Sequence, residues 1–119
     1  MKASELRPGN IIDKKFADSG GFQWSFFRHT EYADLEKYPD NYRPTKLTKE
    51  WLVKFGFKRD KGRNNLPIMR FGGLYVYMDD FTITYMGNIL PTNGYVHELQ
   101  NAFYVLYGKE LTSTPPHPL

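Results

Sequence analysis

Residues 95–107 (Y-V-H-E-L-Q-N-A-F-Y-V-L-Y) carry the clearest structural signal in the chain. Their apolar side chains recur at steps of three and four, as along one face of an amphipathic helix; they are Tyr95, Val96, Leu99, Ala102, Phe103 and Leu106. Thr92 or Asn93 can cap the start of such a helix, and Gly108 tolerates the left-handed backbone that commonly ends one. We therefore expect a helix over residues 94–107 that packs its apolar face on the rest of the chain.

A second helical signal lies in residues 47–57, which read L-T-K-E-W-L-V-K-F-G-F. Thr48 is a good N-cap residue, and Gly56 is suited to end the helix. Trp51, Leu52 and Phe55 then fall on one inward face. The pattern predicts a helix over residues 48–55, and a weaker pattern predicts a short one over residues 30–38 with Thr30 as its cap.

Residues 74–86 predict a β-hairpin, because apolar and polar side chains alternate on both sides of a tight turn at Asp79 and Asp80. The alternation assigns two sets of residues to opposite faces. The expected core face carries Leu74, Val76, Met78, Phe81, Ile83 and Tyr85, and the expected outer face carries Tyr75, Tyr77, Thr82 and Thr84.

Further strands are expected at residues 11–13, 22–27 and 57–59, the first two antiparallel to each other. Phe22, Trp24 and Phe26 share one face of the second of these. The remaining segments of this part of the chain are predicted to connect the strands and helices. We expect an extended linker over residues 41–46, a charged loop over residues 60–67 and a bulge or turn over residues 70–73.

The composition limits the class of protein. A chain of 119 residues fits one domain, and its hydrophobic share of 40% is enough for a real core. The aromatic share of 17% leaves open whether the rings only fill the core or also form a recognition surface. The absence of cysteine excludes disulfides, thiol nucleophiles and Cys-containing zinc sites. With no long apolar stretch either, we expect a soluble cytoplasmic protein with no membrane contact.

The net charge of +3 is unevenly distributed along the sequence. Residues 43–70 hold nine basic and two acidic residues, a charge of +7, and the other seven basic and eleven acidic residues give −4. This basic segment is either a solvated face or a footprint for an anionic partner. Its candidate contacts to nucleic acid or nucleotide are Lys58, Arg59, Lys61 and Arg63. Rings at Trp51, Phe55, Phe57 and Phe71 interleave with the charges, as single-strand binding requires, unless they are buried.

One candidate ligand site lies on the last helix. His97, Asn101 and Tyr104 follow each other at steps of four and three, which places them in a polar stripe beside the apolar face. The alternative is that His97 only helps to pack the helix. No second histidine or carboxylate has metal-ligand spacing on that face, so we expect no metal site.

The sequence has no positive signal for catalysis. It lacks a Walker A motif, a dinucleotide-binding G-x-G-x-x-G and a nucleophile elbow G-x-S-x-G. The adjacent carboxylates Asp79 and Asp80 are explained by their turn. We expect no enzymatic activity and no cofactor.

Three segments together resemble a group of small uncharacterised proteins from Bacteroidetes genomes and their phages or prophages. They are E-L-R-P-G-N-I-I at residues 5–12, L-T-K-E-W-L-V-K-F-G-F at 47–57 and Y-V-H-E-L-Q-N-A-F-Y-V-L-Y-G-K-E-L at 95–111. The matching group motifs are L-R-x-G-N, L-T-x-E-W-L-x-K-F-G-F and Y-V-H-x-L-Q-N, in this order, over about a third of the chain. Pro8 departs from the aliphatic residue usual there. The resemblance implies an accessory protein of a mobile element and assigns no activity.

These signals predict an α+β fold: a small twisted antiparallel sheet, with a barrel-like form as one alternative, and two main helices over residues 48–55 and 94–107 packed on it. Residues 1–111 form the single domain, and the proline-rich residues 112–119 a disordered tail.

The first functional hypothesis is a non-enzymatic macromolecule-binding accessory protein, which can inhibit a host system by contacting a host or phage protein. Nucleic-acid or nucleotide binding through residues 43–70 is the second hypothesis. The third is a small ligand-binding protein or enzyme that uses His97, Asn101 and Tyr104. Tyr75 and Tyr77, on the expected outer face of the hairpin, are further candidate contacts. A homodimer paired through an exposed strand, residues 11–13 or 22–27, also stays open.

Overall fold

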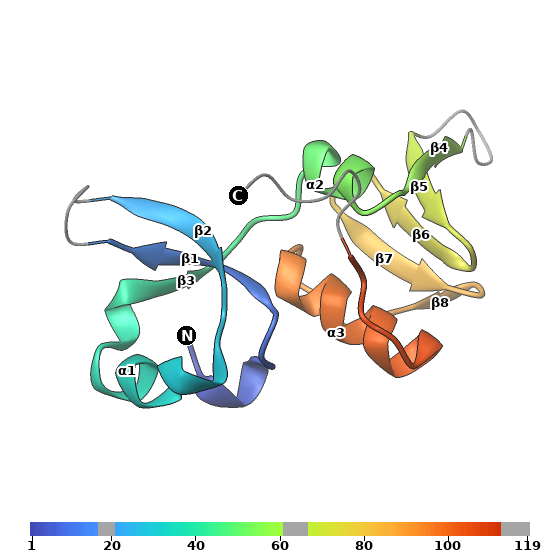
Figure 1. The fold of residues 1–119 in the computed structure, drawn as a ribbon. Coiled ribbons are helices and arrows are strands. Elements are labelled where there is room, and N and C mark those ends of the chain that lie inside the picture. Colours follow the sequence, from blue (N-terminus) through green and yellow to red (C-terminus); the bar gives the residue numbers. More distant parts are fainter. Residues whose placement is uncertain (17–20, 61–66, 113–119) are drawn as a thin grey trace.

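The computed structural model describes residues 1–16, 21–60 and 67–112. It shows an α+β fold with two separate antiparallel sheets and α-helices between and beside them (Figure 1). The strands are β1 (Ile11–Lys15), β2 (Phe22–Phe26), β3 (Tyr42–Pro44), β4 (Lys58–Asp60), β5 (Ile68–Phe71), β6 (Leu74–Tyr77), β7 (Thr82–Tyr85) and β8 (Asn88–Ile89). The helices are α1 (Tyr32–Lys37), α2 (Lys49–Lys54) and α3 (Val96–Tyr107), and three short 3₁₀ helices are η1 (Ala3–Glu5), η2 (His29–Glu31) and η3 (Pro39–Asn41).

The expectation of one sheet with a barrel-like form is wrong, since the strands divide into a three-stranded sheet, β2-β1-β3, and a five-stranded sheet, β4-β5-β6-β7-β8. The sequence predicted an extended linker over residues 41–46, but Tyr42–Pro44 form strand β3 of the first sheet, and the division falls in the segment after Pro44. There the backbone pairs with the start of α3 instead of with a strand: the Leu47 N–H donates to the Gly94 carbonyl at 2.9 Å, and the Val96 N–H donates to the Thr45 carbonyl at 2.9 Å. Because of these bonds, the chain leaves the first sheet after Pro44 and runs beside the start of α3 before α2 begins.

Strand β1 is the centre of the three-stranded sheet, and it separates two hydrophobic clusters. Ile11 belongs to the main cluster with α2, α3 and the five-stranded sheet. The next residue, Ile12, points to the opposite face and packs with Leu35 of α1 and Tyr42 of β3 in a smaller cluster. Because both edges of β1 are paired, it cannot also pair with a second molecule; β2 and β3 are the edge strands.

The five-stranded sheet has both α2 and α3 on the same face (Figure 1). Trp51 and Leu52 of α2 and Phe103 of α3 pack there against the inner side chains of the sheet. The sheet contributes Met69, Leu74, Val76 and Ile83, of which the last three are completely buried. The predicted core face of the hairpin is thus confirmed, and Met78, Phe81 and Tyr85 lie partly buried against the same cluster.

Two parts of the sheet differ from the sequence prediction. Strand β5 was not predicted, because Ile68 and Met69 are consecutive buried residues that break the alternating pattern. Thr84, assigned to a solvated face, is buried; its cross-strand neighbours are Tyr75 and Ile89.

The predicted helices are present, with small differences at their ends. Thr48 caps α2 as predicted, and its side-chain oxygen accepts the Trp51 N–H at 3.3 Å. Gly108 ends α3 with φ = 69°, also as predicted. The start of α3 is different, since neither Thr92 nor Asn93 supplies the cap. Instead, the Glu98 carboxylate reaches back and accepts the backbone N–H groups of Tyr95 and Asn93.

Candidate functional site

The polar face of α3 binds the N-terminal segment of the chain. The Gln100 side chain accepts the Ile11 N–H at 2.7 Å and donates to the Gly9 carbonyl at 3.2 Å. Asn101 accepts from the Arg7 side chain at 2.8 Å and from the Asn10 side chain at 2.9 Å. The motif residues of α3 and of the R-P-G-N turn therefore contact each other directly, which gives both a structural role.

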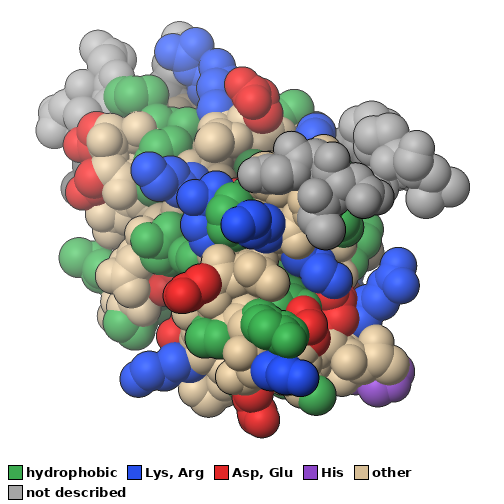
Figure 2. Space-filling view, turned by 90° about the vertical axis from the view of Figure 1, so that its left-hand side faces the viewer, with side chains coloured by type: hydrophobic (Ala, Val, Ile, Leu, Met, Phe, Trp, Pro, Cys, Tyr) green, Lys and Arg blue, Asp and Glu red, His purple; other side chains and the backbone are tan. Residues whose placement is uncertain are grey.

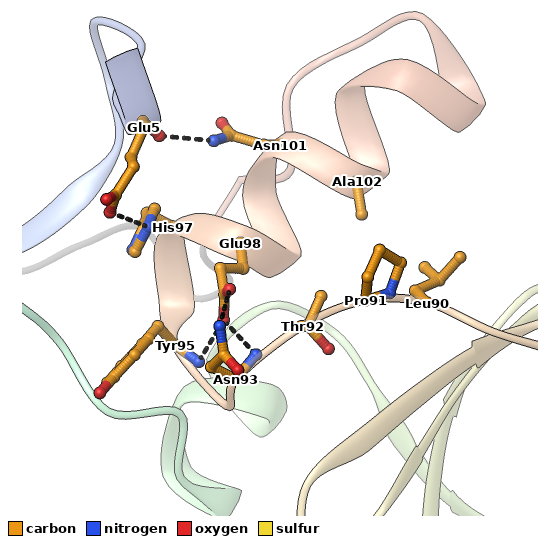
Figure 3. A pocket seen from close by; sticks show the side chains of 10 residues that line it. All are labelled: Glu5, Leu90, Pro91, Thr92, Asn93, Tyr95, His97, Glu98, Asn101 and Ala102. Atoms are coloured by element: carbon orange, nitrogen blue, oxygen red, sulfur yellow. Dashed lines mark hydrogen bonds and ion pairs between the residues drawn. The ribbon is translucent and has the colours of Figure 1, made fainter. Parts of the chain in front are cut away.

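A groove runs along the start of α3, between η1 and the segment that enters the helix (Figure 3). We call it the α3 groove; its volume is about 600 Å³, and it is lined by Glu5, Leu90, Pro91, Thr92, Asn93, Tyr95, His97, Glu98, Asn101 and Ala102. Of the predicted stripe, His97 and Asn101 line this groove. Tyr104 does not, because it lies one turn further on, beneath the guanidinium of Arg7, whose central carbon is 4.3 Å from the ring centroid.

His97 is buried at one wall of the α3 groove. Its Nε2 is 3.9 Å from a carboxylate oxygen of Glu5, and its ring stacks on Tyr95 with 6.0 Å between centroids. Its Nδ1 is buried without a hydrogen-bond partner among the described residues. Burial lowers the pKa of His97, although the charges of Glu98 and Glu5 oppose this shift. A neutral imidazole beside two carboxylates makes this wall rich in hydrogen-bond acceptors.

A second candidate surface is the side of the five-stranded sheet opposite α2 and α3. We call it the outer face; its residues are Lys58, Asp60, Ile68, Arg70, Tyr75, Tyr77, Thr82, Thr84 and Ile89. None of the helices in the described ranges packs on it. The cross-strand register makes Lys58, Arg70 and Tyr75 successive neighbours across β4, β5 and β6. The guanidinium of Arg70 is 5.4 Å from the Tyr75 ring centroid, which is within the range of a cation–π contact.

At the β4 end of the outer face lies a recess of about 450 Å³, the edge recess, lined by Gly56, Lys58, Arg59, Asp60, Arg70, Phe71 and Gly72. Arg70 is held in place there, because its Nε donates to the Gly72 carbonyl at 2.9 Å and one Nη is 3.6 Å from Asp60. Three cations and one carboxylate thus surround the recess, which leaves it with an excess of positive charge.

The structure brings part of the predicted basic site together and separates the rest. Lys58 and Arg59 lie at the edge recess, whereas Lys61 and Arg63 lie outside the described residues. Trp51, Phe55 and Phe57 are buried in the main cluster, so they offer no stacking surface. Phe71, which lines the edge recess, is partly exposed, and so are Tyr75 and Tyr77, which the sequence assigned to the outer face of the hairpin.

The other basic residues of segment 43–70 are spread over the molecule. Arg43 lies on β3 in the other sheet, with its guanidinium carbon 3.5 Å from the Phe22 ring centroid. Lys54 lies over the Trp51 ring at 4.9 Å. On the side that carries β1–β3 and α1, basic, acidic and hydrophobic side chains are interspersed (Figure 2).

Sequence reasoning counted Arg70 in the basic segment 43–70 without naming it as a contact, and it missed Glu5 as a site residue. Arg70 lay in a segment interpreted as a kink, although its position between Met69 and Phe71 on a strand would have placed it on the outer face. Glu5 is ninety-two positions before His97 in the sequence, and no local pattern could bring the two together.

Within residues 1–16, 21–60 and 67–112, no three histidine or carboxylate side chains gather into a group that could hold a metal ion. No helix in the same ranges is both long and apolar enough to cross a membrane. No protein-family model matches the chain, and neither a curated protein nor a solved structure is significantly similar to it.

Proposed function

We propose that this chain is a non-enzymatic binding module that contacts another macromolecule through the outer face of its five-stranded sheet. The observation that carries the proposal is the row Lys58, Arg70 and Tyr75, which crosses three neighbouring strands on a face that none of the described helices covers. In accordance with the motif resemblance, we place the partner among the macromolecules of a phage or of its bacterial host.

The residue types on the outer face support this proposal. A solvated sheet face is ordinary in antiparallel proteins, and such a face usually mixes threonines with both signs of charge. Here the outer face holds two tyrosines and an arginine, which are the residues enriched at recognition surfaces, and Asp60 is its one acidic member among the described residues. Ile89 at the far edge is 75% exposed. Strand pairing fixes the backbone that carries these side chains, so no loop has to be ordered on contact.

The proposal predicts that an outer-face substitution abolishes partner capture while a substitution elsewhere does not. The purified chain, a Tyr75→Ala/Arg70→Gln variant and a Val105→Ser control would each be immobilised and exposed to lysate of a Bacteroidetes host, with and without nuclease. Val105 is 80% exposed on α3, which packs on the side of the sheet opposite the outer face, so it serves as a surface control.

We expect one macromolecule to be retained by the native chain and by the control variant and lost at least tenfold with the outer-face variant. Circular dichroism and thermal melting would verify that all three proteins are folded. Retention that is equal for the native and outer-face variants, or no retention above background, would overturn the proposal.

A further inference from the structure

The proposed function leaves the chemical class of the partner open. The residues of the edge recess indicate which class of ligand fits it. Lys58, Arg59 and Arg70 line the recess, with Asp60 as the single carboxylate; Lys58 and Arg70 are cross-strand neighbours on the outer face, whereas Arg59 is paired with Met69 on the other side of the sheet. Arg70 is already fixed by Gly72 and Asp60, so its guanidinium does not have to be ordered when a ligand arrives. A recess with excess positive charge and a fixed guanidinium is suited to a phosphate group, with which arginine forms charge-assisted hydrogen bonds.

Next to the recess, the outer face presents aromatic rings at a regular spacing. Tyr75 is the immediate cross-strand neighbour of Arg70, about 4.8 Å away along the direction of the interstrand hydrogen bonds. Tyr77 follows on the same strand and the same face, roughly 6.6 Å further along. Both rings are partly exposed. A ligand that reaches from the recess over the sheet therefore meets a cation first and then two partly exposed tyrosine rings, the first of which Arg70 already contacts.

We infer that the outer face binds single-stranded nucleic acid, with a phosphate in the edge recess and bases stacked on Tyr75 and Tyr77. This inference rests on the proposed function, because it needs the outer face to be the binding surface. A single strand supplies both groups that the surface lacks: phosphates for the cations, and unpaired bases whose faces are free to stack on rings. A duplex keeps its bases stacked on each other, and an acidic polypeptide would neutralise the cations but leave the tyrosines without a matching partner.

The test measures fluorescence anisotropy of labelled single-stranded DNA and RNA oligonucleotides, of a duplex of the same length, and of a labelled poly-glutamate peptide. Four single variants accompany the native chain. Lys58→Glu and Tyr75→Leu remove one expected contact each; Lys49→Glu, on α2, and Tyr75→Phe are their matched controls, the first repeating the charge change away from the outer face and the second keeping the ring.

We expect the single strands to bind more tightly than the duplex. Tyr75→Leu should weaken single-strand binding between about 5-fold and 100-fold, which is the range for one stacked base, and Tyr75→Phe should keep most of the affinity. Lys58→Glu should weaken binding and lower the slope of log affinity against log salt by about 0.7, since one phosphate contact is lost. Lys49→Glu should change neither quantity as much.

Three results would overturn the inference: no binding of any single strand, equal effects in the test and control variants, or preferential binding of the poly-glutamate peptide or the duplex. If lysate capture through the outer face succeeds while oligonucleotides fail, only the partner class is wrong. If both fail, the proposed function is wrong as well.

Discussion

Gln100 is a buried polar residue whose side chain satisfies two backbone groups of a distant segment. Only 3% of it is exposed, and both ends of its amide are used, one by the Ile11 N–H and the other by the Gly9 carbonyl. Helix α3 and strand β1 are ninety positions apart in the sequence, so this amide is a main reason why the two lie side by side.

We predict that Gln100→Leu destabilises the fold by about 1–3 kcal/mol, because it leaves the buried Ile11 N–H without an acceptor and removes the donor to the part-buried Gly9 carbonyl. Val105→Ala on the exposed side of the same helix is the control, with an expected effect within about 0.5 kcal/mol. Urea unfolding followed by circular dichroism measures both free energies of unfolding. Equal stabilities of Gln100→Leu and the native protein would contradict the structural role of this amide.

His97 predicts a pH dependence of stability with a definite sign. Burial lowers the pKa of its imidazole in the folded state, so the unfolded chain binds the proton more tightly. The contribution of His97 to stability is therefore fully present above the unfolded pKa of about 6.5 and is lost as the pH falls through the lower folded value. The charges of the Glu98 and Glu5 carboxylates raise the pKa of His97, which reduces this effect and does not reverse it.

We accordingly expect the native protein to lose more thermal stability than His97→Gln when the pH falls from about 7.5 to about 5.5. Melting temperatures of both proteins at the two pH values measure the difference. A parallel decrease in the two proteins would show that other groups cause the acid sensitivity.

At the scale of elements, α3 connects the two sheets. Its polar residues bind the N-terminal turn, its apolar residues pack on the five-stranded sheet, and its first turn pairs with the segment that leads into α2. At its last turn, the Tyr107 hydroxyl accepts the Gly73 N–H at 3.2 Å, which fixes the turn between β5 and β6. Helix α3 thus contacts the N-terminal turn, the five-stranded sheet and the segment before α2 through different side chains and backbone groups.

We predict that Asn101→Ala loosens the N-terminal segment and leaves the five-stranded sheet intact. The variant removes the acceptor of the Arg7 and Asn10 side chains and the donor to the Glu5 carbonyl. Native-state hydrogen exchange should show faster exchange for amides of residues 7–12 and unchanged exchange for β6 and β7. Uniformly faster exchange in both regions would mean that Asn101 stabilises the whole molecule instead.

The sequence predicts the local elements well because their signals are local. Thr48 and Gly108 act through their own backbone neighbours, and the alternation from Leu74 to Ile83 is a property of one hairpin. Nothing local determines which strands join a common sheet, so the division after Pro44 was missed. The candidate site residues differ in the same way. The alternating pattern was enough to predict that Tyr75 and Tyr77 lie on the outer face. The proximity of Lys58 and Arg70 could not be predicted, because it depends on the register between β4 and β5.

At the scale of the whole molecule, the two sheets are expected to unfold together. The main hydrophobic cluster contains Ile11 of the first sheet as well as side chains of α2, α3 and the second sheet. Trp24 of β2 also contacts Trp51 of α2, with 5.2 Å between ring centroids in an edge-to-face arrangement. Neither sheet can therefore lose its structure without exposing part of a cluster that both share.

We predict a single transition in urea, with the same midpoint for tryptophan fluorescence and for far-ultraviolet circular dichroism. The fluorescence reports the Trp24–Trp51 contact between the two sheets, and the dichroism reports secondary structure in all parts of the chain. A fluorescence midpoint at a clearly lower urea concentration would show that the sheets separate before either one unfolds.

The position of β1 has a final consequence for the accuracy of folding. Ile11 and Ile12 are consecutive, yet they fill different clusters on opposite sides of the strand. If β1 moved by one residue against its partners, every side chain on it would change sides. Lys14 would then be directed toward the cluster that contains Ile11, and in one of the two clusters a polar neighbour, Asn10 or Asp13, would take the place of a buried isoleucine. The register of one strand therefore determines which side chains enter both hydrophobic clusters, and a chain with β1 in the wrong register loses native packing on both sides of the strand.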